Sequence, residues 1–194
     1  MPARKRVSRV TIRSARVTTR TGDGGETSLF GKGRVRKTDP RIVALGDLDE
    51  AQSAIGVARA MGPKSTMGRQ LLELQQGLYI AMSEVATPRD DLARLPTRLD
   101  HAALAKVDSA LEWLKARTQI EGRFVIPGDR PIPAALDYAR TVARRAERSV
   151  VACVDAGTVS GEVLLPWLNR VSDLLFVLAR AAEGTSRPSR TVRR

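Results

Sequence analysis

The sequence contains few of the residues on which several common kinds of functional site depend. Its 194 residues include one cysteine, one histidine and only 4% aromatic residues. The single cysteine, Cys153, excludes an intramolecular disulfide and gives no sign of a thiolate metal site, so a reducing compartment is expected. His101 is predicted to be a surface residue on a helix, and Cys153 a small residue that packs between helices.

Long apolar runs are also missing. No segment approaches the roughly 20 apolar residues needed to span a bilayer. The first residues carry positive charge, but no apolar segment follows them, so a secretory signal is not predicted. An Arg-rich leader superficially resembles an organelle transit peptide, but a disordered basic tail is the simpler interpretation. We therefore expect a cytoplasmic protein.

Acidic residues are absent from both ends of the chain. The first twenty residues contain seven Lys or Arg and the last eight contain four, which accounts for most of the net charge of +12. The remaining 22 basic residues stand against 21 acidic ones, so positions 21–186 are nearly neutral. Basic tails can bind polyanions non-specifically, but no aromatic residues are interleaved to stack on bases. We predict basic tails at 1–16 and 187–194 and one domain over 17–186.

A glycine-rich stretch runs from Val17 to Gly33 and contains five glycines, four threonines and a serine. Glycines let the backbone approach a ligand closely, so that successive N–H groups can converge on an anion. The spacings of a Walker A loop and of a Rossmann motif are absent. Composition alone therefore leaves two interpretations, a phosphate-binding loop and a flexible turn.

From residue 39 onward the apolar residues recur at helical spacing. We predict five helices, at about 39–61, 65–86, 97–117, 133–155 and 161–183, with residues 87–96 as a surface loop. The expected helix starts are Asp39 with Pro40, Ser65, and Thr97 with Asp100, while Pro166 belongs in a first turn. Five helices with mostly short connections and no clear strands predict an all-α bundle.

The fourth predicted helix has two distinct sides. Tyr138, Val142, Ala146 and Val150 recur every fourth residue and are predicted to face the core.

Its other side carries a row of arginines, Arg140, Arg144 and Arg148, with Arg145 and Glu147 beside it. Guanidinium groups this close repel one another unless carboxylates or phosphates neutralise them. The row therefore predicts an anion-binding surface, with a solvated, salt-bridged helix face as the alternative.

Three separated motifs complete the sequence evidence. They are Thr19-Arg-Thr-Gly-Asp-Gly-Gly-Glu-Thr-Ser28 with Lys37-Thr-Asp-Pro-Arg41 and Gly46-Asp-Leu-Asp-Glu50; then Arg123-Phe-Val-Ile-Pro-Gly128 with Arg140-Thr-Val-Ala-Arg-Arg-Ala-Glu-Arg148; and finally Leu168-Asn-Arg-Val-Ser-Asp-Leu-Leu-Phe176. In order and spacing they resemble the motifs of the PduO-type ATP:cob(I)alamin adenosyltransferases. The resemblance covers roughly residues 17–183.

This resemblance implies a five-helix bundle that assembles as a homotrimer, with ATP and the corrinoid meeting at each subunit interface. It implies that the triphosphate is bound by Thr19, Arg20, Thr21, Gly22, Thr27 and Lys37, and that the nucleotide site continues through Arg144, Arg145, Glu147, Arg148 and Asn169. It also implies that Arg140 pairs with Asp49 across the interface. Phe124 would press on the lower face of the corrin and exclude an axial ligand from the cobalt.

The implied reaction transfers the 5′-deoxyadenosyl group of ATP to the cobalt of cob(I)alamin and releases triphosphate. Because Co(I) is itself the nucleophile, the protein has to align the reactants and stabilise the leaving group, which Arg, Lys and backbone N–H groups with Mg²⁺ can do. The metal ligands are not identified by the sequence. The resemblance further implies that the product can be delivered to an adenosylcobalamin-dependent mutase.

The sequence departs from the family pattern at several places, including Thr38, which replaces a frequent acid. Asp129 follows Pro-Gly where a glycine is usual, Asp137 stands where a histidine is common, and Ala51-Gln52 replaces Leu-Asn. Asp129 and Asp137 border the implied corrin pocket and motivate a second hypothesis, a non-catalytic ATP-sensing trimer. A third hypothesis is a helical protein that binds polyanions through its basic tails.

Overall fold

The computed structural model describes residues 18–31, 33–62, 65–120 and 125–183, and it confirms a mainly helical fold. The predicted tails at 1–16 and 187–194 lie outside these residues. In chain order the elements are β1 (Glu26–Thr27), β2 (Val35–Arg36), α1 (Pro40–Met61), α2 (Thr66–Ala86), the 3₁₀ helix η1 (Arg89–Arg94), α3 (His101–Lys115), α4 (Pro131–Asp155) and α5 (Leu164–Glu183). None of the described helices has the length and apolar character required to cross a bilayer.

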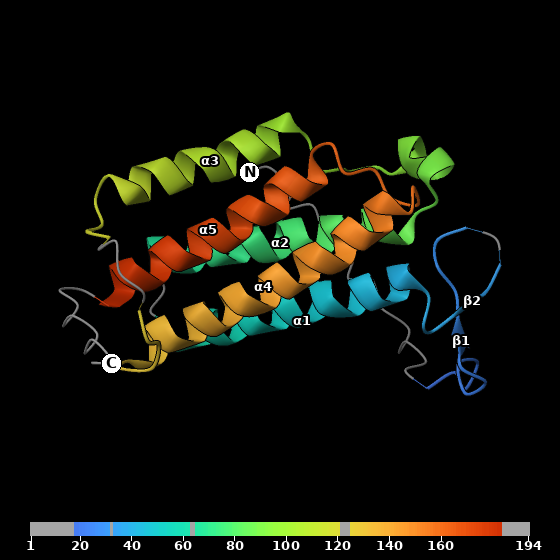
Figure 1. The fold of residues 1–194 in the computed structure, drawn as a ribbon, viewed down its shortest axis with the longest axis horizontal. Helices are drawn as coiled ribbons and strands as arrows, with labels where there is room; N and C mark the ends of the chain where they lie inside the picture. Colours follow the sequence, from blue (N-terminus) through green and yellow to red (C-terminus); the bar gives the residue numbers. More distant parts are fainter. Residues whose placement is uncertain (1–17, 32, 63–64, 121–124, 184–194) are drawn as a thin grey trace, which may run out of the picture.

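The long helices lie side by side in an elongated bundle (Figure 1). Helix α4 packs against both α1 and α5, α2 packs against α1, and α3 packs against the outer side of α5. The core is built from small and branched apolar residues that these helices turn toward one another. Its largest fully buried side chains include Leu48, Ile55, Leu71, Leu78, Leu136, Leu164, Leu168, Leu174, Leu175 and Leu178.

Local capping explains where three helices begin. Asp39 accepts a hydrogen bond from the Arg41 N–H at 2.9 Å, and Ser65 accepts one from the Gly68 N–H at 3.4 Å, as predicted. Burial raises the pKa of Asp39, but hydrogen bonds from Arg41 outweigh this and leave that pKa lowered. The predicted role of Thr97 is wrong, because Asp100 caps α3 by accepting from the Ala103 N–H.

The predicted buried stripe of α4 needs one correction. Val142, Ala146 and Val150 are buried, but Tyr138 is 55% exposed. A spacing of four residues drifts by about 40° per step around a helix of 3.6 residues per turn, so the first member turns away from the core. The buried face instead steps by three and four residues, and Ala139 takes the place predicted for Tyr138.

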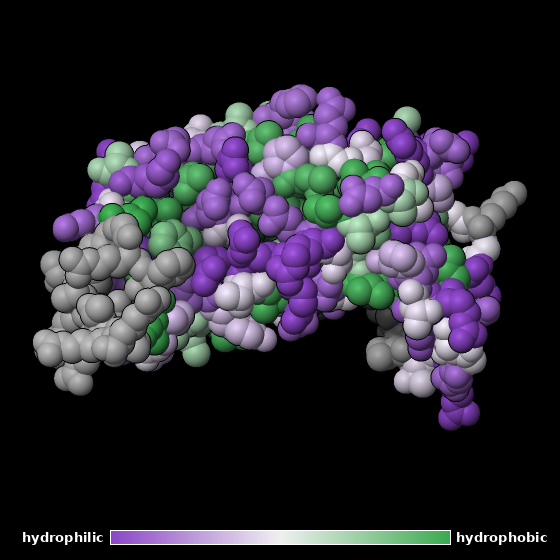
Figure 2. All heavy atoms as spheres, viewed as in Figure 1, coloured by the Kyte–Doolittle hydropathy of each residue, from purple (hydrophilic) through white to green (hydrophobic). Residues whose placement is uncertain are grey.

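Two short elements were not predicted. The glycine-rich stretch contains a small antiparallel hairpin, in which Glu26 pairs with Arg36 and Thr27 with Val35. The stretch predicted as a surface loop at 87–96 contains η1. The hairpin projects beyond the end of the bundle where α1 begins (Figure 1), and its surface is mainly hydrophilic (Figure 2).

Candidate functional site

The glycine-rich hairpin gathers donors around Lys37. A Cβ placed on Gly22 would lie 3.1 Å from Lys37 Nζ, so glycine lets the ammonium group approach the backbone closely. The Lys37 N–H donates to the Gly25 carbonyl at 2.9 Å. The hydroxyl oxygens of Thr19 and Thr21 are 2.9 Å apart. Among the predicted ligand-binding residues, Gly22 is therefore a neighbour of Lys37, and Thr19 is a neighbour of Thr21.

Two further features of this loop were not evident in the sequence. Arg34 joins its two sides, since its Nη2 donates to the carbonyls of Thr21 at 2.5 Å and Glu26 at 3.1 Å. Arg20 has a φ of 61°, a left-handed conformation that non-glycine residues adopt rarely and that often marks functional sites. The loop also contacts the bundle, because the Phe30 N–H donates to the Ala86 carbonyl at the end of α2.

A second group of predicted residues lines a cavity of about 360 Å³ among α3, α4 and α5. Arg140 and Arg144 of α4 form its cationic side, and Phe176 and Val177 of α5 its apolar side. The remaining lining residues are Leu111, Lys115, Ile120, Ser172 and Asp173. A cavity that combines an apolar wall with positioned cations suits a large ligand that has an apolar face and anionic groups nearby.

The arginines of α4 differ in their exposure and in their ion-pair partners. Arg144 and Arg148 are exposed, and neither forms an ion pair with any residue in the described part of the chain. Arg148 Nη1 donates to the Arg144 carbonyl at 3.1 Å. Two cationic groups thus remain available to an anionic ligand.

Arg145 is engaged by α1 instead. Its Nε donates to Asp47 at 3.2 Å and its Nη2 donates to Glu50, while the Ser149 hydroxyl also donates to Asp47. The hydrogen bond with Glu50 raises the pKa of the Arg145 guanidinium, and the charge of Asp47 adds to this. The structure therefore places Arg145 in the α1–α4 contact, a role that its position beside the arginine row did not indicate.

Glu147 and Asn169, both implied by the resemblance to belong to the nucleotide site, contact each other. Asn169 Nδ2 donates to Glu147 Oε1 at 3.2 Å and so joins α4 to α5. Arg170 donates to the Asn169 carboxamide oxygen at 2.8 Å and to Asp108 at the same distance. The amide of Asn169 is thus oriented from both sides.

Arg140 has a partner on its own helix. Its Nε donates to Asp137 at 3.1 Å. Asp49, the residue implied to pair with Arg140 between subunits, is exposed on α1 and forms no ion pair among the described residues.

Comparisons with known proteins identify the family of the chain. A family model described as cobalamin adenosyltransferase matches residues 17–182. The chain belongs to the cobalamin adenosyltransferase family. It is 43% identical over 180 residues to a corrinoid adenosyltransferase of Mycobacterium leprae, covering 88% of this chain and 93% of that relative. It is 35% identical to the corrinoid adenosyltransferase PduO of Salmonella typhimurium, with 90% of this chain and 52% of that relative covered.

Solved structures give the same assignment. A phenylalanine-to-histidine variant of a PduO-type ATP:corrinoid adenosyltransferase from Lactobacillus reuteri, complexed with cobalamin and ATP, has a TM-score of 0.79 and 30% identity. The match covers 86% of this chain and 90% of that one. An arginine-to-lysine variant from the same organism, complexed with ATP, has a TM-score of 0.77 and 29% identity.

Within one chain of this adenosyltransferase family member, the two predicted halves of the nucleotide site are apart. The hairpin projects at the end of the bundle where α1 begins and α4 ends (Figure 1), whereas Arg144 lies 11 residues before the end of α4. At about 1.5 Å per residue this places Arg144 roughly 16 Å along the helix from that end. Phe124, the residue implied to contact the corrin, lies outside the described residues.

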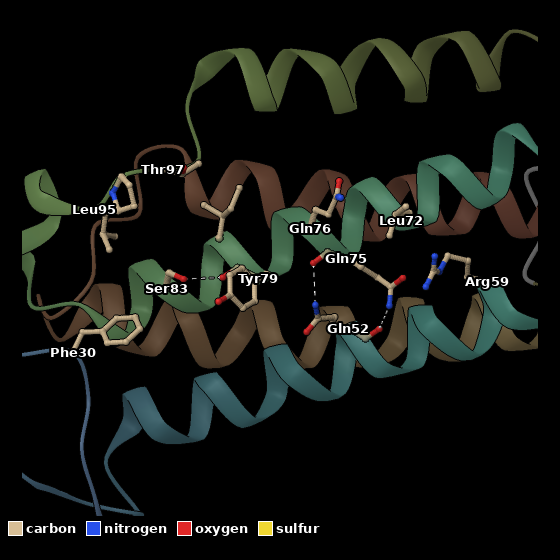
Figure 3. Close-up of a pocket in the computed structure, with 12 residues that line it drawn as sticks. Phe30, Gln52, Arg59, Leu72, Gln75, Gln76, Tyr79, Ser83, Leu95 and Thr97 are labelled. Carbon is tan, nitrogen blue, oxygen red and sulfur yellow. Dashed lines mark hydrogen bonds between the residues drawn. The ribbon is translucent and has the colours of Figure 1, made fainter. Parts of the chain in front are cut away.

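A larger hollow of about 700 Å³ runs along α1 and α2 (Figure 3) and includes none of the predicted site residues. Two of its lining residues, Gln52 of α1 and Gln75 of α2, form a reciprocal pair. Each side-chain amide donates to the other's backbone carbonyl at 3.1 Å. Tyr79, 67% exposed, and Phe30, 57% exposed, form part of its apolar lining.

Proposed function

We propose that this chain is an ATP:corrinoid adenosyltransferase. It transfers the 5′-deoxyadenosyl group of ATP to the cobalt of cob(I)alamin. In this step the Co(I) electron pair forms the bond to C5′, the C5′–O bond breaks, and triphosphate leaves with the bonding electrons. The observation that carries the proposal is the cavity that combines Arg140 and Arg144 with the Phe176 wall, in a chain that belongs to this family.

The chain's own residues have two tasks in this reaction. They must hold C5′ and cobalt in line, because alignment removes most of the entropic part of the barrier. They must also stabilise a leaving group that gains negative charge, which preorganised cations and N–H groups do well in a site that excludes water. We assign the first task to the cavity wall and the second to Arg144 and Arg148 with Lys37 and the hairpin. Thr19, Arg20, Thr21, Gly22 and Thr27 supply the hairpin's other contacts.

Phe124 remains a prediction in this scheme. Ile120, four residues before Phe124 in the sequence, lines the cavity. The family resemblance implies that Phe124 belongs to the same site. There it would pack on the lower corrin face and exclude an axial ligand from cobalt.

Mg²⁺ fits as a partner of ATP rather than as a resident ion. No group of three His, Cys, Asp or Glu side chains able to hold a metal occurs in the described part of the chain. Mg²⁺ that accompanies a nucleotide is typically bound by phosphate oxygens, waters and one or two carboxylates. It therefore does not require a cluster of three protein ligands. The ion would add to the charge stabilisation of the departing triphosphate.

An anaerobic assay tests the activity directly. Purified protein with ATP, Mg²⁺ and chemically reduced cobalamin is expected to form adenosylcobalamin, followed by its visible spectrum, with one triphosphate released per corrinoid converted. ATP binding without any corrinoid conversion or any change in the cob(II)alamin spectrum would favour the ATP-sensing alternative. Asp137 was one of the two residues that motivated this alternative. Its charge is compensated by Arg140 and Arg180, so it does not by itself argue against a corrinoid site. Deleting both basic tails should abolish polyanion binding and leave adenosylation intact.

We further propose that the active unit is a homotrimer in which the hairpin of one subunit meets α4 of the next. The separation of the two halves within one chain supports this arrangement. So do exposed apolar residues on α1 and α2, including Val43, Val57, Met61, Leu72 and Tyr79. The Asp49–Arg140 pair and delivery of product to a mutase belong to the same proposal.

Subunit complementation tests the shared site. Lys37→Ala and Arg144→Ala proteins are each expected to be nearly inactive, because each lacks one half of the triphosphate site. Co-refolding them in equal amounts should restore roughly a quarter of wild-type turnover, the share of sites that receive two intact halves in a randomly mixed ring. Each variant refolded alone is the control. Mixed trimers with no recovered activity would contradict a site built from two subunits.

A further inference from the structure

A buried carboxylate lies behind the wall that α4 and α5 form in the cavity of about 360 Å³. Asp137 is 4% exposed, and its two oxygens accept hydrogen bonds from two different arginines. One is Arg140 Nε at 3.1 Å, and the other is Nη2 of Arg180, a residue of α5 that is itself 6% exposed. Burying a charge is costly unless it is paired, and here each charge is paired.

Arg180 has two further neighbours. Its Nη1 lies 3.0 Å from Glu183 Oε2, and its guanidinium lies 5.5 Å from the centre of the Phe176 ring, within the range of a cation–π contact. Asp137 and Glu183 together balance the charges of Arg140 and Arg180. The four groups therefore form a neutral cluster between α4 and α5.

The cluster ends at two residues of the cavity. Arg140 and Phe176 both line it, and each contacts a member of the Asp137–Arg180 pair. Because Arg140 uses Nε to reach Asp137, both of its Nη groups are left for partners outside this contact. The Asp137–Arg180 pair thus orients the Arg140 side chain and supports the Phe176 ring on the same wall.

We propose that the buried Asp137–Arg180 pair is the positioning element of the corrinoid-facing wall, holding Arg140 and Phe176 in place. This inference rests on the proposed adenosyltransferase function. The pair acts through its two neighbours and does not itself touch either substrate. It also explains how a carboxylate is accommodated in a position that is only 4% exposed.

Stability alone does not account for the pair. Replacing a buried ion pair by apolar residues of similar size is often neutral or stabilising, whereas removing one partner strands the other charge. The double variant Asp137→Leu/Arg180→Met leaves no stranded charge within the pair, although it removes the partner of Glu183. It should therefore unfold at a higher temperature than the single variant Asp137→Asn, which strands Arg180. A change of function in a well-folded double variant would report positioning.

The experiment compares this double variant with wild type and with Glu73→Leu/Lys106→Met, which removes an exposed pair linking α2 to α3. Cob(II)alamin affinity is measured from the visible spectrum of ATP-loaded protein, ATP affinity by calorimetry, and folding by thermal unfolding. We expect the Asp137/Arg180 variant to bind cob(II)alamin about tenfold more weakly, as expected for losing a charged hydrogen bond. Its turnover should fall up to roughly 100-fold through misplacement of the wall. Its ATP affinity and the control's behaviour should match wild type.

Unchanged cob(II)alamin affinity and turnover in the folded double variant would overturn the proposal, as would equal losses for ATP and the corrinoid. Should the double variant not fold, Arg180→Lys replaces it, because lysine keeps the charge but loses the planar fork. The same loss confined to the corrinoid is expected, and wild-type affinity would again overturn the proposal. Wild-type protein that binds no cobalamin would instead contradict the proposed function.

Discussion

Arg144→Ala is expected to lower turnover by about 10²- to 10³-fold, the usual cost of removing one group that stabilises developing charge. Arg144 lines the cavity, is exposed, and forms no ion pair with the described residues. Its positive charge is therefore available to the departing triphosphate. The variant should unfold at the wild-type temperature, because the substitution removes no core packing.

Two further variants test whether the loss of turnover is specific to Arg144. Arg144→Lys keeps the charge but not the bidentate geometry, so an intermediate turnover is expected. Arg94→Ala is the matched control, because Arg94 lies in η1 with a side chain that is 83% exposed, and its one ion pair among the described residues is with nearby Asp91. Its turnover should equal wild type. Near-normal turnover of purified, trimeric Arg144→Ala would remove this residue from the proposed site.

Gly77→Ala is expected to destabilise the bundle by about 1–3 kcal/mol or more, the range for overpacking a well-filled core. A Cβ at Gly77 would lie 2.2 Å from Cζ2 and 2.6 Å from Cη2 of Trp167, so the indole would have to move. Trp167 is 2% exposed and is enclosed by the core. Chemical denaturation followed by far-UV circular dichroism measures the change.

Gly46→Ala serves as the control for helix propensity. Gly46 lies inside α1, and a Cβ there would meet nothing within 4 Å. This variant should therefore be more stable than wild type by roughly 0.5–1 kcal/mol. Combining Gly77→Ala with Trp167→Phe should cost less than the sum of the two single changes, because they share one contact. A Gly77→Ala protein as stable as wild type would show that α2 and α5 are less closely packed than described.

The sequence predicted the features that depend on neighbouring residues. Asp39 and Ser65 begin their helices as expected because a cap needs only a side chain and the N–H groups two or three residues later. The Thr97 prediction was wrong because two capping residues stand near each other and the sequence does not show which one the backbone uses. The error at Tyr138 arose because a spacing of four approximates a helical face over only a few turns.

In the candidate site, too, some features were predictable from the sequence and others depend on helix packing. Its residue types and their order along the chain were sufficient to identify the family and to indicate a glycine-rich donor loop and an arginine row. The partners of those arginines were not predictable, because Asp47 and Glu50 lie almost a hundred residues from Arg145, and Arg180 lies 43 residues from Asp137. Such pairs form only when helices pack.

The amino-acid sequence by itself thus determined the helices, most of their starts, the family and the chemical types of the site residues, since these follow from spacing and from local hydrogen bonds. Tertiary structure alone decided which arginines are neutralised and which face the cavity. It assigned Arg145 to α1, left Arg144 available, and buried Asp137 between Arg140 and Arg180. The physical reason is that the charge of a side chain depends on its type, whereas the electrostatic environment of that charge depends on what the packed helices bring to it.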